Sequence, residues 1–224
     1  MLVTWIGQGG LLFEHNVKRI LIDPYLSDSV EKVQPHNRRR IPIYETLFDL
    51  HIDMMVFTHD HLDHYDPETV SRFLAQEEGI TVLAPSSVWP KVRLYEGNHN
   101  YVLFDEGTQW SECGLCFFAV PAAHSDPLAI GVIVDDGRQR YYVTGDTLYS
   151  SRVVHAVYGR ADVIFLPING VGNNMNATDA ARFAADIEAQ MVVPMHYGMF
   201  DDIEPSILQC PNKRVLEVYQ KVKI

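Results

Sequence analysis

The sequence predicts an α+β domain in which two β-sheets pack together with helices outside. Its 224 residues suit one domain of above-average size with an ample core. Short strand patterns dominate the chain, and in each half the order is strand, loop, strand and then helix. This loose two-fold echo favours two packed sheets. We therefore expect residues 1–224 to form a single domain.

The first half of the chain has strand patterns, then a long connection and a helix. Branched and aromatic residues bounded by Gly and Asn predict short strands at 3–6, 11–14 and 19–22. Residues 24–50 form an irregular insert, and connections of this length are usually functional or mobile. A buried strand is predicted at 54–57. Asp66 then caps a helix that has Pro67 at its first position and Gly79 after its end.

The second half repeats this order around a hairpin. Asp135-Asp136-Gly137 is a hairpin signal. Ser86 or Ser87 is expected to begin a short helix, and Thr178 to cap a longer one over 179–189. The remaining strand predictions are 80–84, 101–104, 116–120, 129–134, 141–144, 163–167, 191–194 and 215–218.

The charge and hydropathy of the chain exclude several classes of partner. A formal net charge of −11 opposes non-specific binding to nucleic acid or to an anionic membrane. No apolar run is long enough to span a bilayer. The first residues, Met1 to Trp5, have the pattern of a strand rather than of a signal peptide. We therefore expect a small-molecule substrate, and neither nucleic acid nor membrane as a partner.

The cysteines indicate a reducing compartment. Three cysteines are too few for a disulfide framework, so a cytoplasmic location is favoured. Cys113 and Cys116 form a single C-x-x-C around a turn-like Gly. A redox or zinc role has no second C-x-x-C to support it, and packing of small apolar side chains at a strand start is the favoured interpretation.

The stretch Thr58-His59-Asp60-His61-Leu62-Asp63-His64 is the densest group of potential ligands in the chain. It lies between the predicted strand at 54–57 and a helix start, where α/β proteins place ligands. Neutral imidazoles and anionic carboxylates together suit a divalent ion of borderline hardness. The alternate spacing lets His59 and His61 reach one ion, while Asp63 and His64 face a second. The alternative is a surface loop that is rich in His and Asp by chance.

Three distant residues share the context of this cluster, because each follows a predicted strand. They are His124, Asp146 and His196. Taken singly, a histidine after a strand is more often a hydrogen-bonded surface residue, and Gly145-Asp146-Thr147 is more often a turn. Together they supply the additional ligands that two ions need.

Two ions can share these seven residues, with Asp146 as the bridge. The ligands assigned to one ion are His59, His61 and His124, and those assigned to the other are Asp63, His64 and His196. Open positions would remain for a shared hydroxide, which is typical of a catalytic site. Asp63 and His196 are the candidate catalytic residues, with Asp63 able to exchange a proton with the water. Zinc and manganese both accept this mixture of ligands.

The motif set resembles the metallo-β-lactamase superfamily. The residues that carry this resemblance are His59-x-His61-x-Asp63-His64, His124, Gly145-Asp146 and His196. The flanking sequence is similar to the ascorbate-6-phosphate lactonase (UlaG-like) group. The matching segments are Trp5-x-Gly7-Gln8, Asp23-Pro24, Asn37-Arg38, Thr58-His59-Asp60-His61, Gly145-Asp146-Thr147-x-Tyr149-Ser150, Met175-x-Ala177-x-Asp179-Ala180 and Val192-Val193-Pro194-Met195-His196. The resemblance implies a four-layer αββα sandwich with metals at one sheet edge, hydrolytic activity and frequent homo-oligomers.

Other residues are candidates for contact with the substrate. Arg38, Arg39 and Arg40 could recognise a phosphate or carboxylate, since guanidinium forms a bidentate fork for such anions. The alternative is a solvated basic loop. Tyr149 and Asn176 lie close to predicted rim loops and could donate hydrogen bonds to a substrate, although a structural role suits each of them better.

The leading hypothesis is a metal-dependent hydrolase that acts on a small lactone, ester or phosphorylated metabolite. A phosphodiesterase or nuclease of the same superfamily is the second, and binding to RNA or DNA at low salt would distinguish it. A di-iron redox role is disfavoured because an acidic residue in place of His61 would suit iron better. A non-catalytic metal-binding protein is the third hypothesis, and it predicts that the metal-loaded protein turns over no ester, lactone or phosphodiester.

Overall fold

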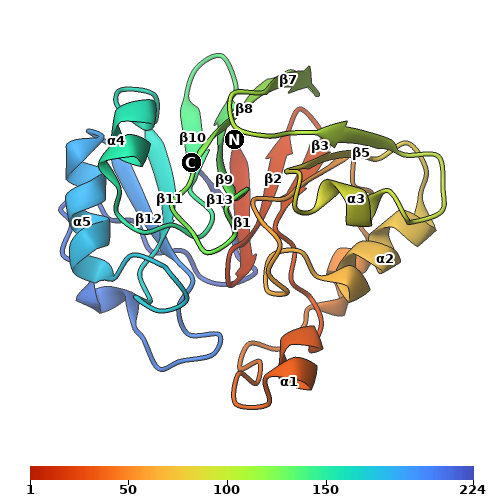
Figure 1. Ribbon diagram of the computed structural model, residues 1–224, viewed down its shortest axis with the longest axis horizontal. Helices are drawn as coiled ribbons and strands as arrows, with labels where there is room; N and C mark the ends of the chain where they lie inside the picture. The colour runs from red at the N-terminus through yellow and green to blue at the C-terminus, as the bar shows by residue number, and fades with distance from the viewer.

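The computed structural model describes residues 1–224 and contains two β-sheets that face each other (Figure 1). The first sheet has seven strands. In spatial order they are β13 (Lys221–Lys223), β1 (Leu2–Gly7), β2 (Gly10–His15), β3 (Lys18–Ile22), β4 (Met54–Val56), β5 (Thr81–Ala84) and β6 (Asn100–Leu103). Strands β3 to β6 run parallel, so their carboxyl ends meet at one edge.

The second sheet has six strands and is also mixed. In spatial order they are β12 (Met191–Met195), β11 (Val163–Pro167), β10 (Arg140–Val143), β9 (Ile130–Asp135), β8 (Leu115–Pro121) and β7 (Gln109–Glu112). Strands β10, β11 and β12 are parallel to one another. The carboxyl ends of these three strands therefore also meet at one edge.

Helices cover the outer faces of both sheets, which gives the predicted αββα layering (Figure 1). Over the first sheet lie α2 (Pro67–Gln76) and α3 (Trp89–Val92), and over the second lie α4 (Ser151–Val157) and α5 (Ala177–Asp186). The insert carries α1 (Ser29–Val33) and the short 3₁₀ helix η1 (Glu45–Asp49), and η2 (Pro205–Ile207) follows β12. None of these helices is both long and apolar enough to cross a membrane.

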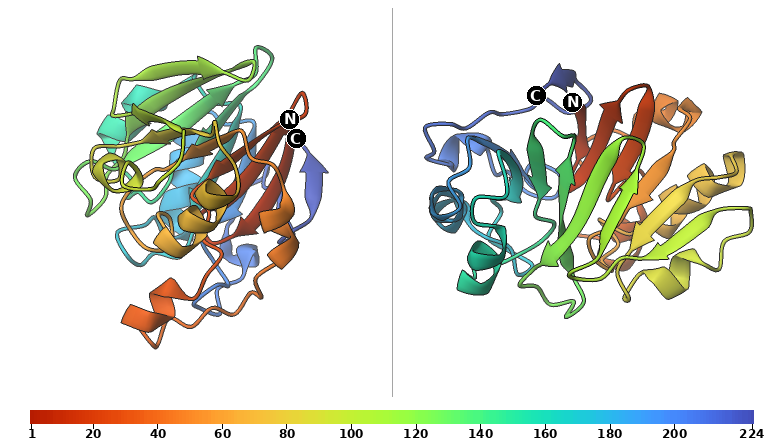
Figure 2. Two further views of the ribbon diagram at one scale, coloured as in Figure 1. Left: turned by 90° about the vertical axis from the view of Figure 1, so that its right-hand side faces the viewer. Right: turned by 90° about the horizontal axis from the view of Figure 1, so that it is seen from above.

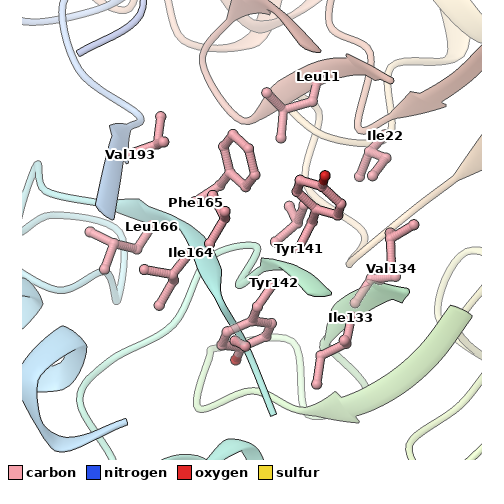
Figure 3. Packing of buried hydrophobic residues seen from close by; sticks show 14 of the residues in the cluster. Leu11, Ile22, Ile133, Val134, Tyr141, Tyr142, Ile164, Phe165, Leu166 and Val193 are labelled. Atoms are coloured by element: carbon pink, nitrogen blue, oxygen red, sulfur yellow. The ribbon is translucent and has the colours of Figure 1, made fainter. Parts of the chain in front are cut away.

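The side chains of each strand alternate between its two faces, and both faces of the sheets are apolar. One face packs against the other sheet, and the large core therefore lies between the sheets. Leu11 and Phe13 of β2 point into the large inner cluster, whereas Leu12 between them points outward to the helix-covered cluster. The Phe13 ring lies 5.7 Å from the ring of Phe165 across the interface. Figure 3 shows the same facing arrangement for Leu11, Phe165 and Tyr141. The predicted fold class is confirmed.

The last strand differs from the prediction. It spans Lys221–Lys223 rather than 215–218, and it pairs antiparallel with β1 through Leu2 and Lys223. The two chain ends therefore lie side by side, as both views of Figure 2 show. Alternation over only three residues is too short a signal to identify this strand from the sequence.

Other elements and helix caps also differ from the prediction. Strand β7 and helix α4 were not predicted, and β7 forms a hairpin with β8 across Cys113 and Gly114. Helix α5 is capped by Asn176, whose side chain accepts from the backbone N–H groups of Thr178 and Asp179. Neither Ser86 nor Ser87 caps a helix, because α3 begins after Val88. The hydroxyl and backbone N–H of Ser86 instead both donate to the carboxylate of Asp105.

Candidate metal centre

The potential ligands come from the ends of strands in both sheets. The histidine cluster follows β4 in the first sheet. His124, Asp146 and His196 follow β8, β10 and β12 in the second sheet. Because the sheets face each other, these strand ends place the side chains against one another. The structure thus brings together all seven residues that the sequence analysis proposed as ligands.

One group of ligand atoms contains three histidines and a carboxylate. The ligand atoms of His59, His61, His124 and Asp146 all lie within 4.8 Å of one another. His124 Nε2 is 3.1 Å from His61 Nδ1, and His59 Nε2 is 4.0 Å from Asp146 Oδ2. The His124 Nδ1 atom faces the backbone carbonyl of Asn173 at 3.4 Å, which leaves Nε2 for the cluster.

A second group lies on the other side of Asp146. The ligand atoms of Asp63, His64 and His196 are also within 4.8 Å of one another. Asp146 Oδ1 is 3.1 Å from His64 Nε2 and 3.3 Å from His196 Nε2. Asp63 Oδ2 lies 3.3 Å from the same His196 atom. The two oxygens of Asp146 therefore face different groups of histidines.

The donor set fits divalent cations, because several of its atoms are buried and lack a hydrogen-bond partner. They are His59 Nε2, His64 Nε2 and Asp146 Oδ1. An unpaired buried polar atom is costly, so a native structure rarely holds three of them together. Cations bound between them would satisfy all three. Nitrogen and carboxylate donors in this proportion are those of zinc and manganese sites.

The protonation of His59 favours a ligand role. Burial, assisted by the neighbouring His64, lowers the pKa of His59 well below its usual value, although Asp146 opposes this shift. Burial likewise lowers the pKa of His124. Both imidazoles are therefore neutral near pH 7, which is the form that binds a metal.

The second group is more tightly ion-paired. Burial alone would lower the pKa of His196, but the nearby carboxylates of Asp146 and Asp63 raise it to about 9. Burial is outweighed in the same way at His64, where Asp146 and Asp23 raise the pKa well above its usual value. The same histidines hold the pKa of Asp146 well below its usual range against the effect of burial. A cation that binds here replaces protons on His64 and His196.

Two residues that position the ligands were missed as site residues. Asp23 is fully buried after β3, and its carboxylate accepts from His64 Nδ1 and from the Thr58 backbone N–H, both at 2.8 Å. Gln8 donates through Nε2 to Asp63 Oδ2 at 2.8 Å and lies 3.0 Å from His196 Nε2. Asp23 follows a strand like the other ligands, so the same rule could have identified it. Gln8 carries the same signal, because it directly follows β1.

A cavity of about 670 Å³ opens beside the ligand cluster. His61, Asp63, Asp146 and His196 are among the residues that line it. The insert 24–50 and the loop after β11 supply its walls. The lining includes amide, aliphatic and carboxylate side chains beside these four ligands, and a small molecule in the cavity can therefore reach the cluster.

The candidate substrate contacts lie outside this lining. Arg39 donates to the backbone carbonyls of Tyr25, Ser27 and Ile41, and Arg40 pairs with Asp202. Arg38 is exposed.

The other two candidates have structural partners. The Tyr149 hydroxyl donates to Asp186 at 2.7 Å, and the Asn176 side chain caps α5. The structure thus does not bring these two residues into the cavity lining.

Comparison with known proteins identifies the family. Residues 18–197 match the model of the Beta-lactamase superfamily domain. A UPF0173 metal-dependent hydrolase from Aeropyrum pernix is 28% identical over 215 residues, which cover 88% of this chain and 83% of that protein.

Solved structures share the fold. A metallo hydrolase from Ignicoccus hospitalis has a TM-score of 0.73 at 21% identity, with 99% of this chain and 97% of that chain covered. An isothiocyanate hydrolase from Delia radicum gut bacteria has a TM-score of 0.77 at 17% identity, covering 100% and 99%. The chain therefore belongs to the β-lactamase superfamily and is a metal-dependent hydrolase with the metallo-β-lactamase fold.

Proposed function

We propose that this protein uses two divalent ions, zinc or manganese, to hydrolyse a small lactone, ester or phosphorylated metabolite, as in the UlaG-like group. The observation that carries this proposal is the position of Asp146 between two groups of ligands. His59, His61 and His124 would hold one ion, and Asp63, His64 and His196 the other. Asp146 faces both groups and would bridge the ions.

The bound ions would supply a water with a pKa near neutrality and would polarise the bond under attack. The protein's own residues then manage the protons. The Asp63 carboxylate is oriented by the Gln8 amide and faces His196, so it can accept a proton from the attacking water. For an ester, the water oxygen bonds to the carbonyl carbon, the bond to the leaving alcohol breaks, and that alcohol takes up the proton.

The charge of the cavity favours small molecules over nucleic acids. Asp60 and Asp201 line its outer part. Carboxylates there would repel a phosphodiester backbone. This supports a metabolite hydrolase rather than the nuclease alternative.

The stoichiometry of metal binding tests the proposal. Protein purified without chelator and supplemented with zinc or manganese should contain two ions per chain by elemental analysis. Asp146→Ala removes the only carboxylate that faces both groups, so occupancy of at least one ion should fall and turnover should drop by orders of magnitude. Glu78→Ala, which removes an exposed carboxylate beyond α2, is the matched control. Full metal content and full turnover in Asp146→Ala would refute the bridging role.

A further inference from the structure

A buried amide without a partner for its donor lies among the residues that line the cavity, as does the proposed bridging carboxylate. The Asn174 side chain is only 3% exposed, and it lines the cavity together with Asp146. Its Nδ2 group is buried and has no hydrogen-bond partner. A buried unpaired donor costs free energy, so its retention at the floor of a substrate cavity needs an explanation.

The orientation of this amide is determined by its neighbour. Asn174 Oδ1 accepts a hydrogen bond of 3.1 Å from the backbone N–H of Thr147, the residue after Asp146. Because a backbone N–H can only donate, the atom that faces it must be the amide oxygen. The Nδ2 group therefore points the other way, and a second backbone bond, from Met175 N–H to the Thr147 carbonyl at 2.9 Å, fixes the loop.

The walls of the cavity are unsuited to an anion. Asp201 lines the wall, and its Oδ1 atom is held by the backbone N–H groups of Gly198 and Ile203. Asp60 also lines the cavity, and its two oxygens accept from Lys91 Nζ at 2.6 and 2.5 Å. The Lys91 ammonium is therefore already paired and does not offer a free charge to an anionic substrate. An anionic group placed beyond the ligand cluster would face the Asp201 carboxylate, and like charges at short range disfavour binding.

The mouth of the cavity offers apolar and neutral polar contacts. Val33 on α1 and Val171 in the loop after β11 line it, and each is 62% exposed. Gln34 and Asn37 also line the cavity, and Gln34 accepts a hydrogen bond from the Asn37 amide at 2.8 Å, so the wall of the insert presents uncharged amides. Aliphatic and amide groups match a substrate with an apolar portion and an uncharged polar group.

We propose that the cavity binds an uncharged carbonyl compound with an apolar portion, and that the carbonyl oxygen accepts a hydrogen bond from Asn174 Nδ2. Neutral esters and lactones belong to this class, whereas phosphorylated metabolites do not. A donor fixed beside the ligand cluster also stabilises negative charge that develops on that oxygen during attack by water. This inference rests on the proposed function, which it narrows to one substrate class.

The test compares two hydroxamates of the same carbon number that differ at one end. Butyrohydroxamic acid ends in a methyl group and succinic monohydroxamic acid ends in a carboxylate, and each carries a carbonyl oxygen and a metal-binding group. Titration calorimetry on the metal-loaded full-length protein should show the neutral probe binding roughly tenfold tighter or more. In Gln34→Arg, the added cation on the wall should strengthen the binding of the carboxylate probe and so reduce the difference in affinity between the two probes.

Two variants at one position separate the donor of Asn174 from its anchoring role. Asn174→Asp keeps an acceptor for Thr147 N–H but removes the donor, whereas Asn174→Ala removes both. Both should weaken the neutral probe by roughly fivefold to tenfold with metal content unchanged. If only Asn174→Ala weakens binding, the amide acts through Thr147 and its role as a donor is wrong.

The remaining outcomes are also decisive. Equal or tighter binding of the carboxylate probe by the unmodified protein would overturn the assignment of an uncharged substrate. Binding of neither probe would overturn it together with the two-ion site. If the neutral probe binds selectively while 4-nitrophenyl butyrate and γ-butyrolactone are not turned over, the proposal of ester and lactone hydrolysis fails and the selectivity of the cavity stands.

Discussion

His64 Nδ1 lies 2.8 Å from Asp23 Oδ2, and both side chains are completely buried. Because a carboxylate can only accept, this contact places a hydrogen on Nδ1 and directs Nε2 toward Asp146. Partners of this kind determine the tautomer and orientation of histidine ligands. Asp23 thus links β3 to the ligand loop after β4, and it supports a proposed metal ligand that is 41 positions away in the chain.

Asp23→Asn should weaken cation binding without unfolding the protein. Asparagine tolerates the left-handed backbone at this position, where φ is +46°. With its oxygen accepting from Thr58 N–H, its amide donates toward His64 Nδ1 and favours the tautomer with hydrogen on Nε2. We expect the dissociation constant for zinc to rise about 10- to 100-fold in calorimetry. Asp28→Asn, at an exposed residue before α1, should bind as the unmodified protein does.

Gly9→Ala should disturb the same histidine from its other side. A Cβ atom at Gly9 would lie 2.5 Å from His64 Cε1 and 2.9 Å from Nδ1, so the ring must move. Gly9 does not have a positive φ, so alanine suits its backbone. We expect weaker zinc binding and a stability loss of about 1–3 kcal/mol.

The control for this variant is Gly107→Ala. Gly107 has a φ of +85° and no atom within 4 Å of an added Cβ. Alanine there should strain the backbone and lower the melting temperature while leaving zinc affinity unchanged. Equal zinc affinity in Gly9→Ala and Gly107→Ala would show that His64 does not need this space.

Arg39→Ala should loosen the insert 24–50. The Arg39 guanidinium donates to three backbone carbonyls of the insert and lies 4.4 Å from the Tyr25 ring centre. Losing these charge-assisted hydrogen bonds should lower the free energy of unfolding by about 1.5–3 kcal/mol. Limited proteolysis should cut the insert faster. Arg38→Ala, at an exposed side chain, is the matched control, and an identical cleavage rate in both variants would contradict the anchoring role.

Asp53→Asn should cost stability in a pH-dependent way. Asp53 accepts from Lys18 Nζ at 2.6 Å and from the Arg19 backbone N–H at 2.9 Å. Burial raises the pKa of Asp53, but these bonds outweigh burial and lower it below its usual value. Its contribution is therefore present above the pKa of the unfolded chain, about 3.9, and is lost as the pH falls through the folded value.

Urea unfolding at two pH values measures this effect. Asp53→Asn should be less stable than the unmodified protein by up to about 1 kcal/mol at pH 7, and the difference should shrink near pH 3. A difference that is the same at both values would mean that the charge of Asp53 does not contribute.

The proposed ligands were predictable from the sequence because their positions follow from a local rule. A short apolar strand ends, and the next polar side chain emerges at the edge of the sheet. This rule found the cluster after β4 and also His124, Asp146 and His196, each of which follows a strand. The layers were predictable for a related reason. A strand such as β2 has apolar side chains on both of its faces, so one face must pack against the other sheet and the other against helices.

The substrate-contact candidates show where a local rule is insufficient. Three adjacent arginines have the composition of an anion site, yet Arg39 donates to carbonyls of its own insert and Arg40 pairs with Asp202. Which partner a guanidinium takes depends on which acceptors the folded chain brings near it, and the sequence does not contain those distances.

By itself, the sequence determined the two-sheet sandwich and the seven potential ligands, because each depends on a pattern of a few residues. Tertiary structure alone decided the contacts around them. Asp23 meets His64, Gln8 meets Asp63, and Asn174 meets the residue after Asp146 only because the strand order within each sheet brings these strand ends together. Such pairs are distant in sequence and carry no shared pattern, so their chemistry appears only once packing has determined the distances.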